Sequence, residues 1–346
     1  VYFIIFALKF IKAESPTGSL RNIKNYPTMS SFQKQSIIWG WVVFALSLLT
    51  YMLSLEPSAS LWDCSEFIAT SYKMEVGHPP GAPLFMMINR IFTIFSPDTA
   101  HVAMFVNTAS AVASALTIAF LFWTIAHLGR RLIRPSDRNY TPTSVETAIV
   151  MAAAFIGSMA YAFTDTFWFS AIEGEVYAQS SLFTALVFWT ILKWENVADQ
   201  PHADRWLVLL AYLMGLSIGV HLLNLLAIPA IVLVYYYRTH DVRSRAGWWK
   251  ALGVSVVILG AVLYVIIPGT VRLGAFVDRI FVNGLDLPVN SGLAFSLIAI
   301  VSLLGYGAYR AQMKGRRVLN IALLCAGVIV IGYSTYASVV IRSVEN

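Results

Sequence analysis

Charged residues are scarce in this chain. Asp, Glu, Lys and Arg make up 12% of its 346 residues, against 58% hydrophobic residues. An ordinary soluble domain has about 25% charged residues. So few charges exclude a water-soluble fold of this length, because polar side chains could not cover that much apolar surface.

Cysteine is also scarce, and no alternating pattern of short apolar segments is present. The two cysteines, Cys64 and Cys325, exclude a disulfide framework. The apolar residues instead form runs of roughly 16 to 28 residues, and a helix needs about 20 residues to cross the ~30 Å hydrocarbon core. Lipid offers the backbone no hydrogen-bond partner, so the runs predict helices rather than the ten-residue strands of a barrel.

The predicted fold is therefore all-α, a polytopic transmembrane helical bundle with about nine spans. The spans are predicted at residues 37–55, 100–128, 146–164, 176–193, 206–220, 221–237, 249–268, 292–309 and 318–340. Residues 206–237 would be about 48 Å long as one helix. Since Arg205 and Arg238 both favour the cytoplasm, we predict a helical hairpin that turns outside near Gly219 to His221. Residues 83–95 are predicted to form an amphipathic helix along the outer interface.

Basic residues set the predicted orientation. A net charge of +6 could indicate a nucleic-acid partner, but the basic residues lie in short loops between apolar runs, which argues against one. A cytoplasmic N-terminus places 19 of the 24 Lys and Arg residues inside and 11 of the 18 acids outside. This distribution follows the positive-inside rule.

Three divisions of the chain are expected. Residues 1–36 are predicted to be a cytoplasmic segment, within which we interpret residues 1–28 as an upstream translation or partial leader before a natural start at Met29. Residues 37–341 form the membrane module, and residues 342–346 begin a truncated C-terminal portion.

Ionisable side chains are almost absent from the centres of the spans. Ion-coupled transporters usually bury such residues near the midplane, so a transporter or flippase is disfavoured, although it remains an alternative together with a noncatalytic scaffold. Polar residues gather instead in three outer segments, at residues 60–83, 170–180 and 219–224.

Asp63 and Glu66 are the first candidates for chemistry. Their i, i+3 spacing puts both carboxylates on one helix face, where they could deprotonate an acceptor and hold a metal or donor. Alternatively, Ser60 or Asp63 caps a helix, since D-x-x-E resembles a capping box. The other candidates also have structural alternatives: a rigid turn at His78, solvated loop acids at Glu173 and Glu175, and a satisfied interfacial histidine at His221. No His/Cys cluster has metal-ligand spacing. The sequence therefore leaves open whether the site holds a divalent metal.

A resemblance to a known family adds to this interpretation. The motif W-D-x-x-E-F…G-H-P-P-G-x-P within residues 54–92, with EGEVYAQSSLFTAL and GLSIGVHLLNLLAIPAI downstream, resembles the bacterial protein O-mannosyltransferase-like family, also known as domain of unknown function 2723 and similar to glycosyltransferase family 117. The likeness runs from about Trp39 to the end of the chain. It implies a GT-C type membrane glycosyltransferase in the cytoplasmic (inner) membrane, with its active site facing the periplasm. The implied donor is a mannose-like sugar on polyprenyl phosphate, and the implied acceptor is a protein Ser or Thr hydroxyl.

The resemblance also implies roles for individual residues. The acidic catalytic residues of the first outer loop of GT-C enzymes match Asp63, as general base, and Glu66. The leaving phosphate needs a cation or metal to offset its charge, and the outer basic residues are candidates. The expected substrate-binding residues are His78, Glu173, Glu175, Tyr177, His221, Asn224, Lys73, Arg90, Arg272 and Arg279.

The orientation gives a testable prediction. Reporters that are active only outside the cytoplasm should give signal when fused after residues 75 and 285 and none after residue 135, because the basic loop at 129–145 stays inside. The reverse pattern would contradict both the topology and the location of the site.

Overall fold

The computed structural model describes residues 29–133, 140–240 and 245–345, and within these ranges every regular element is helical. The all-α prediction is confirmed. The first elements are α2 (Ser31–Leu53), α3 (Cys64–Lys73), α4 (Pro83–Thr93), η1 (Thr99–His101), α5 (Val102–Ile133), α6 (Ser144–Ala162) and α7 (Asp165–Ile172). They are followed by α8 (Val176–Val197), α9 (Arg205–Ile218), η2 (Leu222–Ala227), α10 (Ile228–Thr239), α11 (Arg245–Ala261), η3 (Val262–Ile266), α12 (Ile267–Leu285), α13 (Ser291–Met313), α14 (Arg317–Tyr333), η4 (Ser334–Tyr336) and α15 (Ala337–Glu345).

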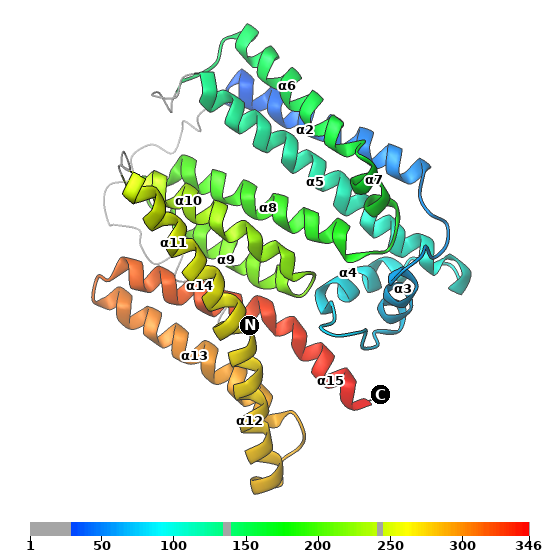
Figure 1. The fold of residues 1–346 in the computed structure, drawn as a ribbon, viewed down its shortest axis with the longest axis vertical. Coiled ribbons are helices and arrows are strands. Elements are labelled where there is room, and N and C mark those ends of the chain that lie inside the picture. The colour runs from blue at the N-terminus through cyan, green and yellow to red at the C-terminus, as the bar shows by residue number, and fades with distance from the viewer. Residues whose placement is uncertain (1–28, 134–139, 241–244, 346) are drawn as a thin grey trace, which may run out of the picture.

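The long helices lie side by side, and α5 is the most buried of them (Figure 1). It packs against α2, α6 and α8. Large side chains such as Phe122, Ile118 and Tyr51 fill the core on its α2 and α6 side. A second apolar core lies between α8, α9, α10 and α14. Capping boxes at Ser30 and Thr143 define the starts of α2 and α6, because each satisfies two backbone N–H groups that a helix start leaves free.

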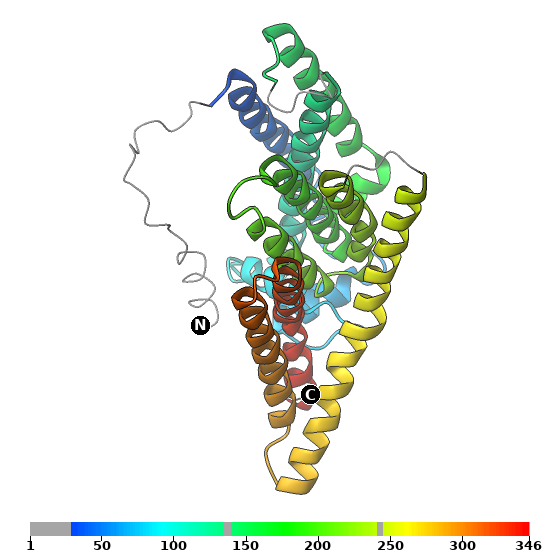
Figure 2. The same cartoon turned by 90° about the vertical axis from the view of Figure 1, so that its left-hand side faces the viewer.

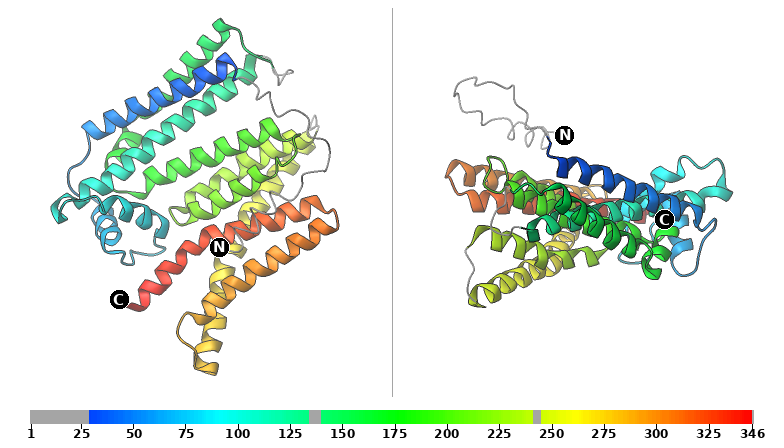
Figure 3. Two further views of the ribbon diagram at one scale, coloured as in Figure 1. Left: turned by 180° about the vertical axis from the view of Figure 1, so that it is seen from behind. Right: turned by 90° about the horizontal axis from the view of Figure 1, so that it is seen from above.

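Among the described residues, seven helical stretches are long and apolar enough to cross a membrane, judged by length and composition. The other two predicted spans are α8 and α9, which lie among these helices in the bundle (Figure 3). The hairpin is present as predicted, with α9 ending at Ile218 and η2 beginning at Leu222. Arg238 donates to the Glu195 carbonyl, and Arg317 pairs with Asp204 at 2.7 Å. The basic ends of α10 and α14 therefore meet the loop between α8 and α9.

The span predicted at residues 249–268 belongs to a longer helix. The chain stays helical from Arg245 to Leu285, and Figure 2 shows this long helix running past the rest of the bundle. The predicted span ended at Pro268. The helix instead opens into a π turn at Val262–Ile266, just before Pro268. Such a turn lets a helix continue past a proline ring that would clash with the preceding carbonyl.

The last predicted span is interrupted. Residues 318–340 were expected to form one helix, but α14 ends at Tyr333 and the 3-10 turn η4 leads into α15. The hydroxyl of Tyr336 in this turn donates to the Gly81 carbonyl at 3.1 Å and lies 3.3 Å from the Ile218 carbonyl. The break therefore connects the end of the bundle to the loop before α4.

Two glycines let α9 and α14 approach each other closely. A Cβ atom on Gly215 would lie 2.5 Å from the Ile329 carbonyl oxygen, and one on Gly332 would lie 2.5 Å from the Leu216 backbone nitrogen. Both contacts are with backbone, which cannot rotate away as a side chain can. The crossing therefore depends on the absence of side chains at these two positions.

We predict that Gly215→Val lowers the stability of the protein by about 3 kcal/mol or more, because overpacking against side chains already costs about 1–3 kcal/mol. Thermal unfolding in detergent would measure the change. Gly253→Val is the matched control, since a Cβ there meets nothing within 4 Å. Equal melting temperatures for the two variants would contradict the proposed crossing.

Candidate functional site

The first outer segment forms two short helices at one end of the bundle. α3 packs against α4, and the rings of Phe67 and Phe85 lie 5.1 Å apart between them. The amphipathic helix predicted at residues 83–95 is confirmed as a helix, α4, which buries Phe85, Met86 and Asn89. Because α3 and α4 pack against each other, they fix both ends of the loop at residues 74–82 that connects them.

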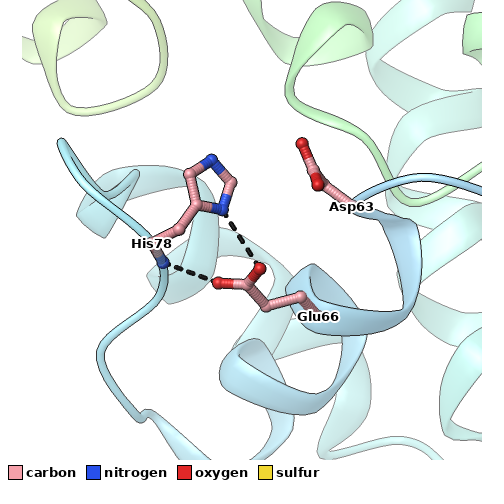
Figure 4. A group of neighbouring side chains, drawn as sticks. All are labelled: Asp63, Glu66 and His78. Atoms are coloured by element: carbon pink, nitrogen blue, oxygen red, sulfur yellow. Dashed lines mark hydrogen bonds and ion pairs between the residues drawn. The ribbon is translucent and has the colours of Figure 1, made fainter.

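Glu66 and His78 form an ordered pair within this segment. Glu66 accepts a hydrogen bond from the His78 backbone N–H at 2.6 Å, and its other oxygen lies 3.1 Å from His78 Nδ1. The backbone hydrogen bond is the largest influence on Glu66 and lowers the pKa of its carboxyl, against a smaller effect of burial. Figure 4 shows Asp63 approaching the same space from the start of α3. The interpretation of His78 as only an incidental residue in a rigid turn is therefore disfavoured.

Asp63 occupies the N-cap position of α3 but makes no capping hydrogen bond with its side chain. The Ser60 hydroxyl does not cap α3 either, since it donates to Glu173 Oε2 at 2.5 Å. Trp62, just before Asp63, has a φ of 63°. This left-handed conformation is unusual for a large residue, and such strain is found most often at functional sites. The capping alternative does not account for Asp63.

The second outer segment brings two buried carboxylates to the same end. Glu173 and Glu175 are only 5% and 6% exposed, so neither is a solvated loop acid. Gly174 between them permits close packing on α5, since a Cβ atom there would lie 2.9 Å from Val106 and 3.0 Å from Asn107 Oδ1. Ser60 connects this segment to the first one through its hydrogen bond with Glu173.

Burial changes the acidity of both glutamates. It raises the pKa of Glu173, although the hydrogen bond from Ser60 opposes the change. Burial likewise raises the pKa of Glu175, to about 7, although the hydrogen bond from the Val176 backbone N–H opposes this change. Repulsion from Glu173 and Asp63 raises the pKa of Glu175 further, and attraction to His78 lowers it. Glu175 is coupled electrostatically to Asp63 and His78, so these groups lie near one another.

The third outer segment lies against both of the others. The Leu84 N–H donates to the Gly219 carbonyl at 2.8 Å, which attaches the hairpin turn to the start of α4. His221 lies beside Tyr177, with 5.7 Å between the ring centres, and its Nδ1 accepts from the Leu223 N–H. Burial lowers the pKa of His221, so its ring is neutral at pH 7. The three outer segments therefore converge.

Three other predicted residues are engaged in structural contacts. Asn224 is buried and accepts from Ser180 and Thr184 at 2.7 and 2.9 Å. Arg90 donates to the Tyr72 carbonyl at 2.7 Å and covers the Tyr72 ring, which joins α4 to the end of α3. Lys73 is exposed and pairs with Glu75 at 3.6 Å.

Arg272 and Arg279 lie apart from these groups. Both are on α12, whose far end extends away from α3 and α4 (Figure 1). Arg279 lines a cavity of about 380 Å³ between α12, α13 and Val340 of α15, and the lining of this cavity includes none of the residues of the three outer segments.

The sequence did not single out two residues that hold the site together. Tyr336 hydrogen bonds to the carbonyls of Gly81 and Ile218. Arg342 donates to the Lys73 and Met74 carbonyls at 3.2 and 2.9 Å, at the end of α3. Arg342 is one of the few outer basic residues, and this was the only sequence signal for its role.

The sequence of this chain is similar to those of known proteins. Residues 63–244 match the family described as the Protein O-mannosyl-transferase TMEM260 N-terminal domain. The chain is 22% identical over 224 residues to the protein O-mannosyl-transferase tmem260 of Dictyostelium discoideum, over 63% of this chain and 25% of that protein. It is 23% identical over 176 residues to the TMEM260 protein of Mus musculus, over 51% of this chain and 22% of that protein. The aligned part is thus about a quarter of these relatives. No solved structure matches.

Glu175 should make stability depend on pH. Folding raises the pKa of its carboxyl from 4.5 to about 7, so the folded protein binds more protons than the unfolded chain between these values. Stability should therefore fall as the pH rises through this window, by roughly 3 kcal/mol in total. Glu175→Gln should melt at the same temperature as the wild type near pH 4.5 and at a higher temperature at pH 8. The exposed Glu75→Gln serves as the control, and a wild-type pH profile in Glu175→Gln would contradict the prediction.

Proposed function

Because the chain belongs to the protein O-mannosyl-transferase TMEM260 N-terminal domain family, we propose that it carries the sugar-transfer site of a GT-C type membrane glycosyltransferase. The donor is a mannose-like sugar on polyprenyl phosphate, and the acceptor is a protein Ser or Thr hydroxyl. The reaction takes place at the non-cytoplasmic face, which is the periplasmic face if the membrane is an inner membrane. Two observations support this assignment. The family match covers the second and third outer segments and the first from Asp63 onward, and these segments meet at one end of the bundle.

The observation that carries the proposal is the state of Asp63. Its carboxylate lies at the start of α3 without a capping hydrogen bond, beside an ordered Glu66–His78 pair. A general base must be able to reach the proton that it removes, and a carboxylate engaged in capping could not do so as well. Glu66, in contrast, accepts two hydrogen bonds from His78 and is better suited to positioning.

The proposed reaction is a displacement at the anomeric carbon. The acceptor oxygen attacks this carbon while its proton passes to Asp63. The bond from the carbon to the phosphate oxygen breaks, and its electron pair leaves with the lipid phosphate. The charge that develops on the phosphate is stabilised by positive groups placed near it. Lys73 is the exposed basic residue of α3 and the nearest candidate along the chain, while Arg272 and Arg279 would require the lipid to extend toward α12.

The buried glutamates would act on the sugar rather than on the acceptor proton. With a pKa of about 7, Glu175 is partly protonated at neutral pH and can then donate a hydrogen bond to a sugar hydroxyl. His221 is neutral, so its ring offers one donor and one acceptor. Tyr177 is half-exposed beside it and offers a ring face against which a sugar can stack. These groups make the predicted substrate-binding surface, together with His78.

Asp63→Asn tests the proposal. The variant should lower sugar transfer from a polyprenyl-phosphate donor to protein by on the order of 10² to 10⁴, because it removes the base. Its melting temperature should stay within error of the wild type, since the side chain makes no capping hydrogen bond. Asp63→Ala should behave in the same way.

The matched control is Asp98→Asn, which alters another exposed aspartate of the outer loops, one that does cap a helix through the His101 N–H. It should retain transfer activity. Near-normal transfer by Asp63→Asn would refute the role of Asp63 and assign the base to Glu66 or Glu175. No transfer by the wild-type full-length protein with any polyprenyl-phosphate sugar would refute the proposed function.

A further inference from the structure

Three potential metal ligands converge at the start of α3. One ligand atom from each of Asp63, Glu66 and His78 lies within 4.8 Å of the other two. Adjacent ligands of a bound divalent ion are about 3 Å apart, given metal to ligand distances of about 2.1 Å. The side chains of His78 and Glu66 are 45% and 38% exposed, so small rotations can close the remaining gap. An ion from solution can also reach them.

The Glu66–His78 pair has the arrangement that metal sites use to orient a histidine. In such sites one ring nitrogen binds the metal while the other donates its N–H to a carboxylate. Here His78 Nδ1 lies 3.1 Å from Glu66 Oε2, and the His78 backbone N–H fixes the second Glu66 oxygen. This leaves Nε2 of the ring available, on the side of the pair that Asp63 also approaches (Figure 4).

Glu175 is a further, buried carboxylate near this group, and a nearby cation would favour its ionised form over its protonated form. Glu175 is only 6% exposed. Its carboxylate accepts a long hydrogen bond, 3.4 Å, from the adjacent Val176 N–H. It is nevertheless coupled electrostatically to Asp63 and to His78. A buried carboxylate needs a compensating charge or good hydrogen bonds.

Two arginines hydrogen bond to backbone carbonyls at the end of α3. Arg90 donates to the Tyr72 carbonyl, and Arg342 donates to the Lys73 and Met74 carbonyls. Among the described residues, Asp63, Glu173 and Glu175 form no ion pair with a Lys or Arg side chain. In the part of the chain that the structure describes, several carboxylates therefore share one end of the bundle without a Lys or Arg partner in an ion pair.

We propose that Asp63, Glu66 and His78 form a binding site for a divalent cation, with Asp63 and His78 as ligands and Glu66 as a ligand or as the group that orients His78. A set of carboxylate oxygen and imidazole nitrogen suits Mn²⁺ or Zn²⁺ better than Ca²⁺. The role of the ion rests on the proposed function: it would offset the charge of the lipid phosphate that leaves. One Asp63 oxygen can bind the ion while the other accepts the acceptor proton.

Binding can be measured without any transfer assay. The full chain in detergent is titrated with Mn²⁺ alone, and free Mn²⁺ is quantified by electron paramagnetic resonance. We expect one saturable site in the wild type, and a loss of affinity of on the order of tenfold to a hundredfold in His78→Gln, Asp63→Asn and Glu66→Gln. Thermal unfolding of each variant confirms that it is folded before it is titrated.

The chain contains a matched control. Asp98 and His101 form an exposed pair with 2.7 Å between Oδ1 and Nδ1, but no third ligand from the described residues accompanies them. His101→Gln should bind Mn²⁺ as the wild type does. The proposal is overturned if the wild type shows no saturable site below about 1 mM, or if folded His78→Gln and Asp63→Asn both keep the wild-type affinity.

Transfer measurements separate this proposal from the proposed function. If transfer occurs and is unaffected by a chelator, and Mn²⁺ does not bind, the cation site is wrong and the transferase remains. If Mn²⁺ binds at Asp63 and His78 but no sugar is transferred, the transferase is wrong and the cation site remains. Transfer that is lost with a chelator and restored by Mn²⁺, together with binding, supports both.

Discussion

The interior of a bilayer offers the backbone no hydrogen-bond partner, and most of the structure follows from this constraint. Each apolar stretch satisfies its own peptide groups as a helix, so the chain can turn or become irregular only where water or other protein supplies partners. The loops and short helices, and the carboxylates and histidines that they carry, therefore collect at the ends of the bundle. One end holds α3, α4 and the segments at Glu173–Glu175 and Gly219–His221.

Close contacts with backbone hold that end together. Gly174 lies against α5, Gly219 accepts from the start of α4, and Tyr336 hydrogen bonds to the carbonyls of Gly81 and Ile218. These contacts come from five regions of the sequence and restrict the relative positions of the three outer segments. The result is a group of acids in different states: Glu66 paired with His78, Glu173 and Glu175 buried, and Asp63 exposed without a cap. Such differences in environment are how one site assigns different roles to similar side chains.

Hydropathy and charge predicted the helical fold, the hairpin at Gly219–His221 and the short helix α4 from sequence. These predictions were accurate because burial in lipid and the cost of moving charge act on local composition. The same approach failed at Pro268, where the π turn at Val262–Ile266 let the helix continue. It also missed the turn in the last span. Both depend on backbone adjustments that composition does not encode.

At the site, the sequence by itself determined which residue types were available and that Asp63 and Glu66 share a helix face, because their spacing fixes that relation. The family motif is also a property of sequence alone. Tertiary structure decided the rest: Ser60 bonds to Glu173 instead of capping α3, His78 pairs with Glu66, and Glu175 is buried with a pKa of about 7. It also commits Arg90 to the Tyr72 carbonyl rather than to a substrate. Several of these contacts join residues far apart in the chain, such as Ser60 and Glu173. Their existence depends on how the helices pack, which local spacing cannot specify.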